Sequence, residues 1–338
     1  MSTICGVGID VSARELTVSI AGKAAQSFEN NAKGHRAISR LVTDCAKGEA
    51  QVCVEATGSY SLDLCFHLQS CGFRVMVANP RAVANFAKAM MSRSKTDPMD
   101  AEVLRQFAER MPFVEWVPPS QAALELRAAS RRLDSLSNML TREKNRLPDW
   151  LMSEGWARAT KTTISIVSDD LKSSIKHLQG RMERLIKKIE SFIKTEPLLH
   201  ARYRRLQTVR GIAARSAIRL LGELATMPVD MSPKQCVAHA GLDPRQHQSG
   251  SSIDRPARIS KRGNGYLRSA LYMPAVVASQ HDPIIKAFYE RLLEKGKKPL
   301  CALVAIMRKL LHGIIGMFKT GTDFDAQLLF PNIRVQGV

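Results

Sequence analysis

Three prolines within ten residues, in the segment MPFVEWVPPS at 111–120, constrain the fold more than any other feature of the sequence. Proline lacks a backbone N–H and has a fixed φ, so neither a long helix nor a central strand runs through such a segment. We therefore expect the chain to divide here. A length of 338 residues with 45% hydrophobic composition is enough for more than one core, and two or three domains are predicted.

The part before the prolines alternates short apolar runs with helical patterns, which is typical of an α/β layer fold. Strands are predicted in ICGVGID, ELTVSIAG, SFEN, QVCVEA and FRVMVANP, and helices near 33–46 and in SLDLCFHLQSCG. Several of these strands end at loops that we expect to lie at one edge of a sheet.

The part after the prolines is predicted to be mainly helical. An amphipathic helix follows at once, and a second, from about Ser168, repeats apolar residues at alternating spacings of four and three. This spacing predicts a coiled-coil seam, formed by Leu171, Ile175, Leu178, Met182, Leu185, Ile189 and Phe192. An antiparallel hairpin that closes on itself and a contact between two copies both fit such a seam. Residues from about 203 to 325 are expected to form a further globular unit.

The charge balance favours a polyanionic partner. Fifty Lys and Arg against 31 Asp and Glu give a formal charge of +19 and a pI near 9.9, which suits nucleic acid better than a small metabolite. The seven cysteines form no CxxC pair, so we expect reduced core residues and a cytosolic protein. No export signal is apparent, and Arg308 and Lys309 interrupt the apolar stretch CALVAIMRKLLHGIIGMF, so no membrane segment is expected.

Two aspartates stand three positions apart in KTDPMDAEV, at 95–103. Asp97 followed by Pro98 predicts a helix start, with Asp97 as N-cap and Asp100 on the same turn. Capping and a favourable interaction with the helix dipole would by themselves explain both acids.

Two further acids end apolar strands: Asp10 in GVGIDVS and Glu55 in VCVEATG. One such acid alone is usually a solvated turn residue. Together with Asp97 and Asp100, however, they provide four oxygen donors of the kind that hard divalent cations prefer. Two Mg²⁺ ions about 4 Å apart can clamp the attacking and leaving oxygens of a scissile phosphate. The sequence therefore predicts a metal site for phosphoryl chemistry.

The order GIDVS, VEATGSY and KTDPMDA resembles the RuvC-like, RNase H-fold catalytic domain of the DEDD insertion-sequence transposases of the IS one-ten family. Asp10, Glu55, Asp97 and Asp100 match the four family acids. The stretch from AGLDPRQ to YLRSALYMPA, at 240–275, resembles the C-terminal transposase domain of that family.

The resemblance implies an α/β RNase H-like (RuvC-like) N-terminal domain, a coiled-coil helical middle and a mainly α C-terminal transposase domain. The expected boundaries are 1–112 for the catalytic domain, 113–200 for the linker and coiled coil, 201–330 for the transposase domain and 331–338 for a tail.

The resemblance also implies the activity: a recombinase that moves its own element, guided by a structured noncoding bridge RNA that pairs with donor and target DNA. It implies Mg²⁺, or Mn²⁺ as an alternative, at the four acids, and a nucleophilic serine at Ser249 in QSGSS. The serine is expected beside the acids of another protomer in a dimer or tetramer, in the bacterial cytoplasm at the nucleoid. A flexible linker would also explain SGSS, and His247 either assists the serine or contacts solvent.

Basic residues are the predicted nucleic-acid contacts. They are Lys95, Arg210, Arg245, Arg255, Arg258, Lys261, Arg262 and Arg268. Most of them cluster around Ser249. Such a cluster either contacts phosphate groups or forms a solvated surface, and the sequence is compatible with both. The segment 206–225 resembles a helix-hairpin-helix, although Arg210 and Ala213 replace the usual Pro and Gly, and an ordinary packed helix pair fits equally well.

Three other functions compete with this interpretation. A sugar kinase or actin-like ATPase would need glycine-rich nucleotide loops, which the sequence lacks, as it lacks a P-loop and zinc-type histidine spacing. A junction nuclease would use the four acids with water and have no use for Ser249. A nucleic-acid-binding protein without catalysis would have no need of the acids.

Overall fold

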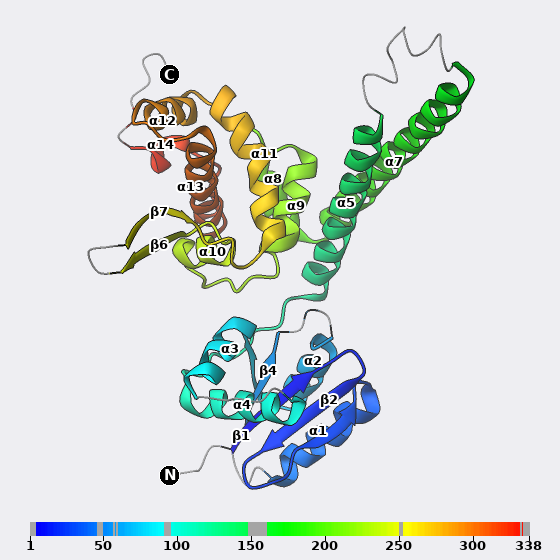
Figure 1. Cartoon of the computed structure of the whole chain (residues 1–338), viewed down its shortest axis with the longest axis vertical. Coiled ribbons are helices and arrows are strands. Elements are labelled where there is room, and N and C mark those ends of the chain that lie inside the picture. Colours follow the sequence, from blue (N-terminus) through cyan, green and yellow to red (C-terminus); the bar gives the residue numbers. More distant parts are fainter. Residues whose placement is uncertain are drawn as a thin grey trace. The chain divides into compact units, whose positions relative to one another are not determined.

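The computed structural model describes residues 5–45, 50–56, 58, 60–90, 96–147, 161–249, 253–331 and 333. Of residues 161–165, 246–249 and 253–257 it describes the backbone alone. The chain forms two compact units, Met1–Pro118 and Pro119–Val338, which are coloured blue to cyan and green to red in Figure 1.

The first unit is built on a mixed five-stranded sheet. Its strands are β1 (Cys5–Val11), β2 (Glu15–Ile20), β3 (Gln26–Glu29), β4 (Ala50–Glu55) and β5 (Arg74–Ala78). They lie in the order β3-β2-β1-β4-β5. β1 pairs antiparallel with β2 and parallel with β4. The five predicted strands are confirmed.

Helices cover both faces of this sheet. They are α1 (Ala32–Cys45), α2 (Leu62–Ser70), α3 (Pro80–Ala89) and α4 (Asp97–Arg110). Ile9 and Val54 join one core with residues of α1 and α2, whereas Cys53 joins a second core with residues of α3 and α4, such as Phe107. Because side chains alternate along a strand, each face of the sheet packs against its own pair of helices.

The sequence placed the start of α4 one residue too late. Thr96 has an extended backbone and is the N-cap, without a side-chain capping bond, so Asp97 is the first helical residue and not the N-cap. The boundary follows from the first helical hydrogen bond, which the Asp100 N–H donates to the Thr96 carbonyl at 2.9 Å. Asp97 and Asp100 still share the first turn.

The proline-rich segment lies along the sheet instead of forming a free spacer. The Trp116 N–H donates to the Val75 carbonyl on β5 at 2.7 Å. The Trp116 ring meets the Phe66 ring edge-on with centroids 5.3 Å apart, and Arg74 pairs with Glu115 at 3.5 Å. The segment therefore belongs to the first unit up to Pro118.

The second unit is mainly helical. Its helices are α5 (Gln121–Arg146), α7 (Lys161–Thr195), α8 (Pro197–Leu206), α9 (Ala214–Leu224), α10 (Pro233–His239), α11 (Gly265–His281), α12 (Pro283–Glu294), α13 (Pro299–Thr320) and α14 (Ala326–Leu329). An antiparallel hairpin of β6 (Pro244–Ser249) and β7 (Ile253–Ile259) interrupts them. The sequence did not predict this hairpin, because its strands are polar and basic and lack apolar alternation.

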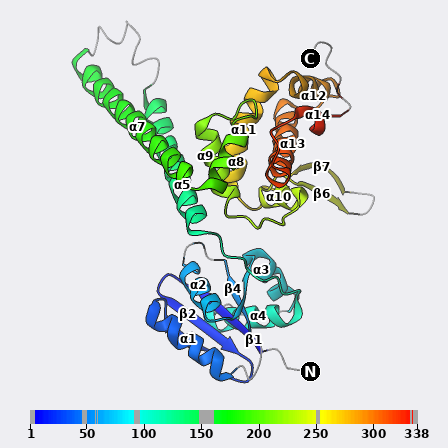
Figure 2. The ribbon, with the colours of Figure 1, turned by 180° about the vertical axis from the view of Figure 1, so that it is seen from behind.

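Helices α5 and α7 lie side by side and run in opposite directions (Figures 1 and 2). The seam residues Leu178, Met182 and Ile189 of α7 are buried in the same core as Leu126 and Leu133 of α5. The helix starts at Lys161, earlier than predicted. The apolar face of α7 thus packs within its own chain, as the hairpin interpretation predicts, and contact between copies stays a prediction.

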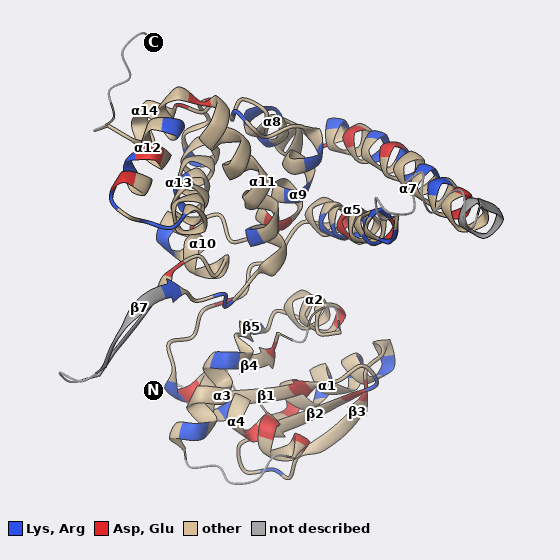
Figure 3. Ribbon diagram, turned by 45° about the horizontal axis from the view of Figure 1, so that its top comes forward, with Lys and Arg blue, Asp and Glu red and all other residues tan. Residues whose placement is uncertain are grey.

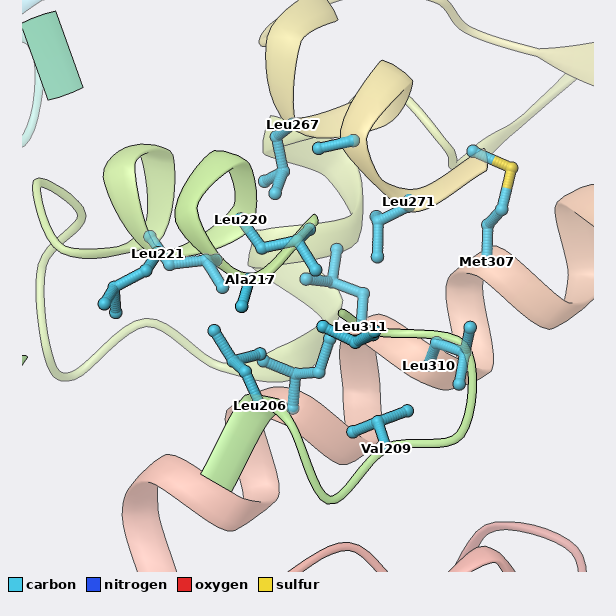
Figure 4. Packing of buried hydrophobic residues seen from close by; sticks show 14 of the residues in the cluster. Leu206, Val209, Ala217, Leu220, Leu221, Leu267, Leu271, Met307, Leu310 and Leu311 are labelled. Atoms are coloured by element: carbon cyan, nitrogen blue, oxygen red, sulfur yellow. The ribbon is translucent and has the colours of Figure 1, made fainter. Parts of the chain in front are cut away.

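The core of the second unit collects leucines from many helices (Figure 4). Helix α13 is the one helix in the described ranges that is long and apolar enough to cross a membrane. Its residues Leu310 and Leu311 are fully buried, and its Lys309 Nζ donates to the Leu329 carbonyl at 2.9 Å. Within this unit α13 is the central packing helix.

The seven cysteines are free thiols, as predicted. Three of them are buried, but Cys71 and Cys301 are exposed and so are not core residues.

Candidate active site and nucleic-acid interface

Two of the predicted acids stand on neighbouring parallel strands. Gly8 of β1 pairs with Cys53 of β4, and Ile9 pairs with Val54, so Asp10 and Glu55 are next in register. Neighbouring strands lie about 4.8 Å apart. Parallel strands end at the same edge of a sheet. The fold therefore brings these two acids together, as the sequence predicted for strand-end residues.

Both acids face helix α4. Ile9 and Val54 point into the core under α1 and α2, so the residues on either side of them point to the opposite face. Cys53 confirms the alternation, because it packs with α4 residues in the other core. Burial raises the pKa of the Cys53 thiol to about 12, and the nearby charge of Glu55 adds to the effect.

Two glycines of β1 let α4 pack closely on the strand. A Cβ at Gly8 would lie 2.0 Å from the Ala101 carbonyl oxygen and 2.2 Å from the Arg105 nitrogen. A Cβ at Gly6 would lie 2.6 Å from the Glu109 side chain. The late residues of α4 thus lie over the start of β1 and the early ones over its middle, so the helix runs antiparallel to the strand.

This direction carries the first turn of α4 toward the Asp10 end of β1. The turn holds Asp97 and Asp100. Asp10, Glu55 and Asp100 are partly buried and Asp97 is exposed. The four predicted acids therefore belong to one face of the sheet and to the helix turn that covers it.

The donor set fits a hard divalent cation, because all four groups are carboxylates. In the part of the chain that the structure describes, no three His, Cys, Asp or Glu side chains come close enough to hold a metal ion. The strands and the helix thus bring the four acids to one region of the unit. Within the described residues, their side chains do not form a ready-made group of three metal ligands.

Glu102 joins α4 to the sheet, a role that the sequence analysis did not predict. Its carboxylate accepts hydrogen bonds from Arg105 Nε at 2.8 Å, Gln106 Nε2 at 2.7 Å and Ser19 Oγ of β2 at 2.7 Å. The bonds from Arg105, ahead of those from Gln106 and Ser19, lower the pKa of Glu102 to about 2. The carboxylate therefore stays ionised and keeps the hydrogen bonds from its three donor residues.

Asn30 joins the loops that follow the two acid-bearing strands. Its Nδ2 donates to the Ser12 carbonyl at 2.8 Å and to the Tyr60 carbonyl at 3.1 Å. Its Oδ1 lies 2.9 Å from His35 Nε2. The one hint in the sequence was an asparagine between a predicted strand and a predicted helix, a position that favours turns.

The predicted nucleophile lies in the second unit. Ser249 is the last residue of β6, where its backbone pairs with Ile253, and His247 pairs with Arg255. The backbone of Ser249 thus belongs to a strand and not to an irregular linker. The side chains of these four residues, and all of Lys95, lie outside the described residues.

The turn between α8 and α9 is closed by α11. Arg210 Nη1 donates to the His281 carbonyl at 2.7 Å. Gly211 has φ +99°, and a Cβ there would lie 2.8 Å from the Pro274 carbonyl oxygen. This packing favours the ordinary helix pair over a hairpin whose turn is open to phosphate.

The remaining predicted basic contacts are accessible. Arg245 and Arg258 are exposed and stand opposite each other in the hairpin, an arrangement of like charges that an anion would relieve. Lys261 and Arg262 are exposed, whereas Arg268 is partly buried and donates to the Ala240 carbonyl at 2.8 Å.

The two units differ in charge. Residues 1–118 contain 13 Lys and Arg against 12 Asp and Glu, and residues 119–338 contain 37 against 19. The formal charges are therefore +1 and +18, so the second unit holds almost the whole excess. Figure 3 shows basic residues in blue along α5, α7 and α9 of this unit.

Comparison with known proteins gives two family matches. The model of the DEDD transposases of IS110, described as transposase, matches residues 7–153. The model described as transposase, IS116/IS110/IS902 family, matches residues 203–290. The first match implies an RNase H-like α/β region, which agrees with the mixed sheet of the first unit.

Individual relatives agree with these matches. The pilin gene-inverting proteins of Moraxella bovis and Moraxella lacunata are each 30% identical to this chain, over 81% of this chain and 82% of theirs. An uncharacterized protein of the insertion element IS110 from Streptomyces coelicolor is 25% identical over 49% of this chain and 40% of its own length. The chain thus belongs to the IS116/IS110/IS902 family of transposases, enzymes that cleave DNA strands and transfer them.

Proposed function

We propose that the protein is an RNA-guided DNA recombinase that uses Asp10, Glu55, Asp97 and Asp100 together with Ser249 to cleave and rejoin DNA. The observation that carries the proposal is the register of β1 and β4, which places Asp10 beside Glu55 on the face that α4 covers. The family matches support the same assignment, because they span the regions of the acids and of the serine.

The four carboxylates would hold Mg²⁺, with Mn²⁺ as an alternative. A bound divalent cation would offset negative charge at the scissile phosphate as it builds up. Asp10 and Glu55 would supply fixed oxygens, because they stand on paired strands. Asp97 and Asp100 would complete the ligand set from the first turn of α4, because no three carboxylates of the described residues are grouped closely enough to hold a metal ion.

Ser249 would attack the phosphorus of the cleaved strand. A bond forms between its hydroxyl oxygen and phosphorus as the bond to the leaving DNA oxygen breaks, and the hydroxyl proton passes to a base. The product is a phosphodiester between protein and DNA, so a hydroxyl of a new strand can displace the serine. His247, two residues earlier, is the candidate for the base.

The serine and the acids belong to different units, and we propose that oligomerisation brings them together from different protomers. The charge of the second unit supports binding of donor DNA, target DNA and a structured guide RNA. A dimer or tetramer that uses the α5 and α7 helices, in the cytoplasm at the nucleoid, completes the proposal.

The deciding experiment is a search for the covalent complex. Protein, Mg²⁺, copurified RNA and DNA are mixed, and denaturant-resistant adducts are digested with trypsin. The expected result is DNA on the peptide 246–258, assigned to Ser249 by fragmentation. Ser249→Ala should abolish the adduct, whereas Ser251→Ala and Ser252→Ala should keep it.

Each competing function predicts a different result. A junction nuclease that uses water would cleave without an adduct, and its Ser249→Ala variant would cleave at the wild-type rate. A non-catalytic binding protein would neither cleave nor form the adduct. Sequencing of copurified RNA tests guidance separately, because one structured RNA should be enriched over random RNA of equal length.

A further inference from the structure

A pocket of about 820 Å³ opens in the second unit between α5, α9, α11, α13 and the segment that follows β7. Its lining includes Arg215, Arg219, Lys261, Arg268, Ser269 and Tyr272. A volume of this size lies within the range of small-ligand sites, about 300–1,000 Å³. The pocket combines basic, hydroxyl and aromatic side chains from elements that are distant in the sequence.

Positive charge in the pocket exceeds the negative charge that balances it. Arg219 forms an ion pair with Asp134. Across the described ranges, Lys261 and Arg268 form no salt bridge, and Arg215 forms none but lies near enough to Asp134 to interact with its charge. Burial, followed by the charge of Arg219 one helical turn away, lowers the pKa of Arg215. A bound anion would relieve this repulsion.

The segment that carries Lys261 is held in place before any ligand binds. Lys261 has φ 52°, a left-handed conformation that is uncommon for a residue with a side chain. Its N–H donates to the Gly241 carbonyl at 3.0 Å, and the Ser260 hydroxyl donates to Asp243 Oδ1 at 2.5 Å. Strain of this kind is characteristic of functional sites, where the surrounding structure maintains it.

An accessible aromatic wall lies beside the cations. Tyr272 is 41% exposed and stands one helical turn after Arg268 on α11. The neighbouring Met273 is 52% exposed. An aromatic face next to a cationic groove is the arrangement that binds the base and phosphate of an unpaired nucleotide.

We infer that this pocket binds a phosphodiester and its adjoining unpaired base in a single-stranded segment of nucleic acid. Arg215, Lys261 and Arg268 would contact the phosphate, and Tyr272 would stack on the base. A duplex receives protruding protein elements in its grooves, whereas a concave site suits a separated strand. The inference deepens the proposed function, because recombination guided by RNA requires strands to separate.

The test measures binding of labelled single-stranded DNA, single-stranded RNA and duplex DNA of equal length by the full chain, without divalent cation. In Arg215→Gln/Lys261→Asn, the affinity for single-stranded DNA, for single-stranded RNA or for both should fall about tenfold or more, and the salt slope should fall by about one. Duplex affinity should change less than about threefold. Arg291→Gln, on the exposed face of α12, is the matched control.

A second measurement does not depend on a folded variant. A single-stranded oligonucleotide that contains iodouracil should photocrosslink to wild-type protein on the tryptic peptide 269–286, whose one tyrosine is Tyr272. Single-strand affinities in the double variant within twofold of the control, or crosslinks confined to other peptides, would overturn the inference. Loss in the DNA arm alone or the RNA arm alone supports it and identifies the strand.

These outcomes are separate from the test of the proposed function. If the pocket variants lose single strands but wild-type protein forms no adduct at Ser249, the inference stands and the proposed chemistry fails. If the adduct forms and the pocket variants bind single strands normally, the inference fails and the chemistry stands.

Discussion

The two units place their functional residues by different means. In the first unit, with a formal charge of +1, the backbone register of β1 and β4 and the contact of α4 with Gly8 position the acids. In the second unit, with a formal charge of +18, long basic side chains project from several helices and from the hairpin. Backbone register fixes a small constellation tightly, whereas long side chains cover a wider surface that suits a polyanion.

Acidic residues also have a structural role in both units. In the second unit, Glu223 is 2% exposed and accepts from Arg131 and Asn264, and Asp134 pairs with Arg219. These two carboxylates are thus held in internal ion pairs. In the first unit, Glu102 pairs with Arg105 in the same way.

The largest expected effect comes from removing one acid of the first unit. Asp10→Asn or Asp100→Asn should lower strand exchange about a thousandfold, the result of losing about 4 kcal/mol of transition-state stabilisation. The nucleic-acid affinity of each variant should stay within about twofold of the wild-type value, because the excess positive charge lies in the second unit. Recombination assays and filter binding measure both, with Asp44→Asn on α1 as control. Full recombination by either variant would end the metal-site proposal.

The next effect tests the placement of the acids by the backbone. In Gly8→Ala the new methyl group would lie 2.0 Å from the Ala101 carbonyl oxygen, so α4 must move away from β1. We expect the free energy of unfolding to fall by about 2 kcal/mol. We also expect the strand-exchange rate of the folded variant to fall, because the acids on α4 move with the helix. Thermal unfolding and strand-exchange rates measure the two losses.

The matched control for this change is Gly316→Ala in α13, where nothing lies within 4 Å of the added carbon. It should leave stability unchanged or slightly raised. Wild-type activity in Gly8→Ala would show that the site does not depend on the position of α4.

A third change addresses the second unit alone. Glu223→Leu leaves Arg131 and Asn264 without their acceptor and should destabilise this unit by about 3 kcal/mol. Limited proteolysis should then cut within 119–338 sooner, while 1–118 resists as before. Glu290→Leu removes the partner of an exposed pair, 3.9 Å from Lys286, and should change stability by about 0.5 kcal/mol or less. Equal stability and equal proteolysis rates in the two variants would contradict the claim that buried Glu223 stabilises this unit.

The smallest effect depends on pH and belongs to Glu102. Its folded pKa is lowered from 4.5 to about 2, so its contribution is complete above about pH 4.5 and is lost as the pH falls toward 2. Because the group is partly exposed, the contribution is about 1 kcal/mol or less. The stability difference between wild type and Glu102→Gln should be constant near neutral pH and shrink in acid. If this stability difference grew as the pH fell, it would contradict the role of ionised Glu102 in stability.

Much of the first unit could be predicted from its sequence. Apolar runs that end at Asp10 and Glu55 mark strands, and Pro98 marks the start of a helix, so local pattern sufficed for the elements that carry the acids. Helix α3 was missed, although Asn79 and Pro80 form a capping signal in which the Asn79 side chain accepts from the Arg81 N–H.

The second unit was less predictable for physical reasons. The β6 and β7 strands carry few apolar residues, so their pairing has no periodic signal. The pocket joins Arg215, Lys261 and Tyr272, which are distant in the sequence and meet through tertiary packing. Interactions of this kind leave no trace in local spacing.

The segment around Trp116 affects the tendency of the protein to aggregate at high concentration. A sheet with a bare outer strand can recruit a strand from another molecule and aggregate. The chain between α4 and α5 lies along β5 and donates a hydrogen bond to the Val75 carbonyl. Its prolines have no backbone N–H groups to pair with a strand from another molecule. The same residues that end the first unit therefore protect one edge of its sheet.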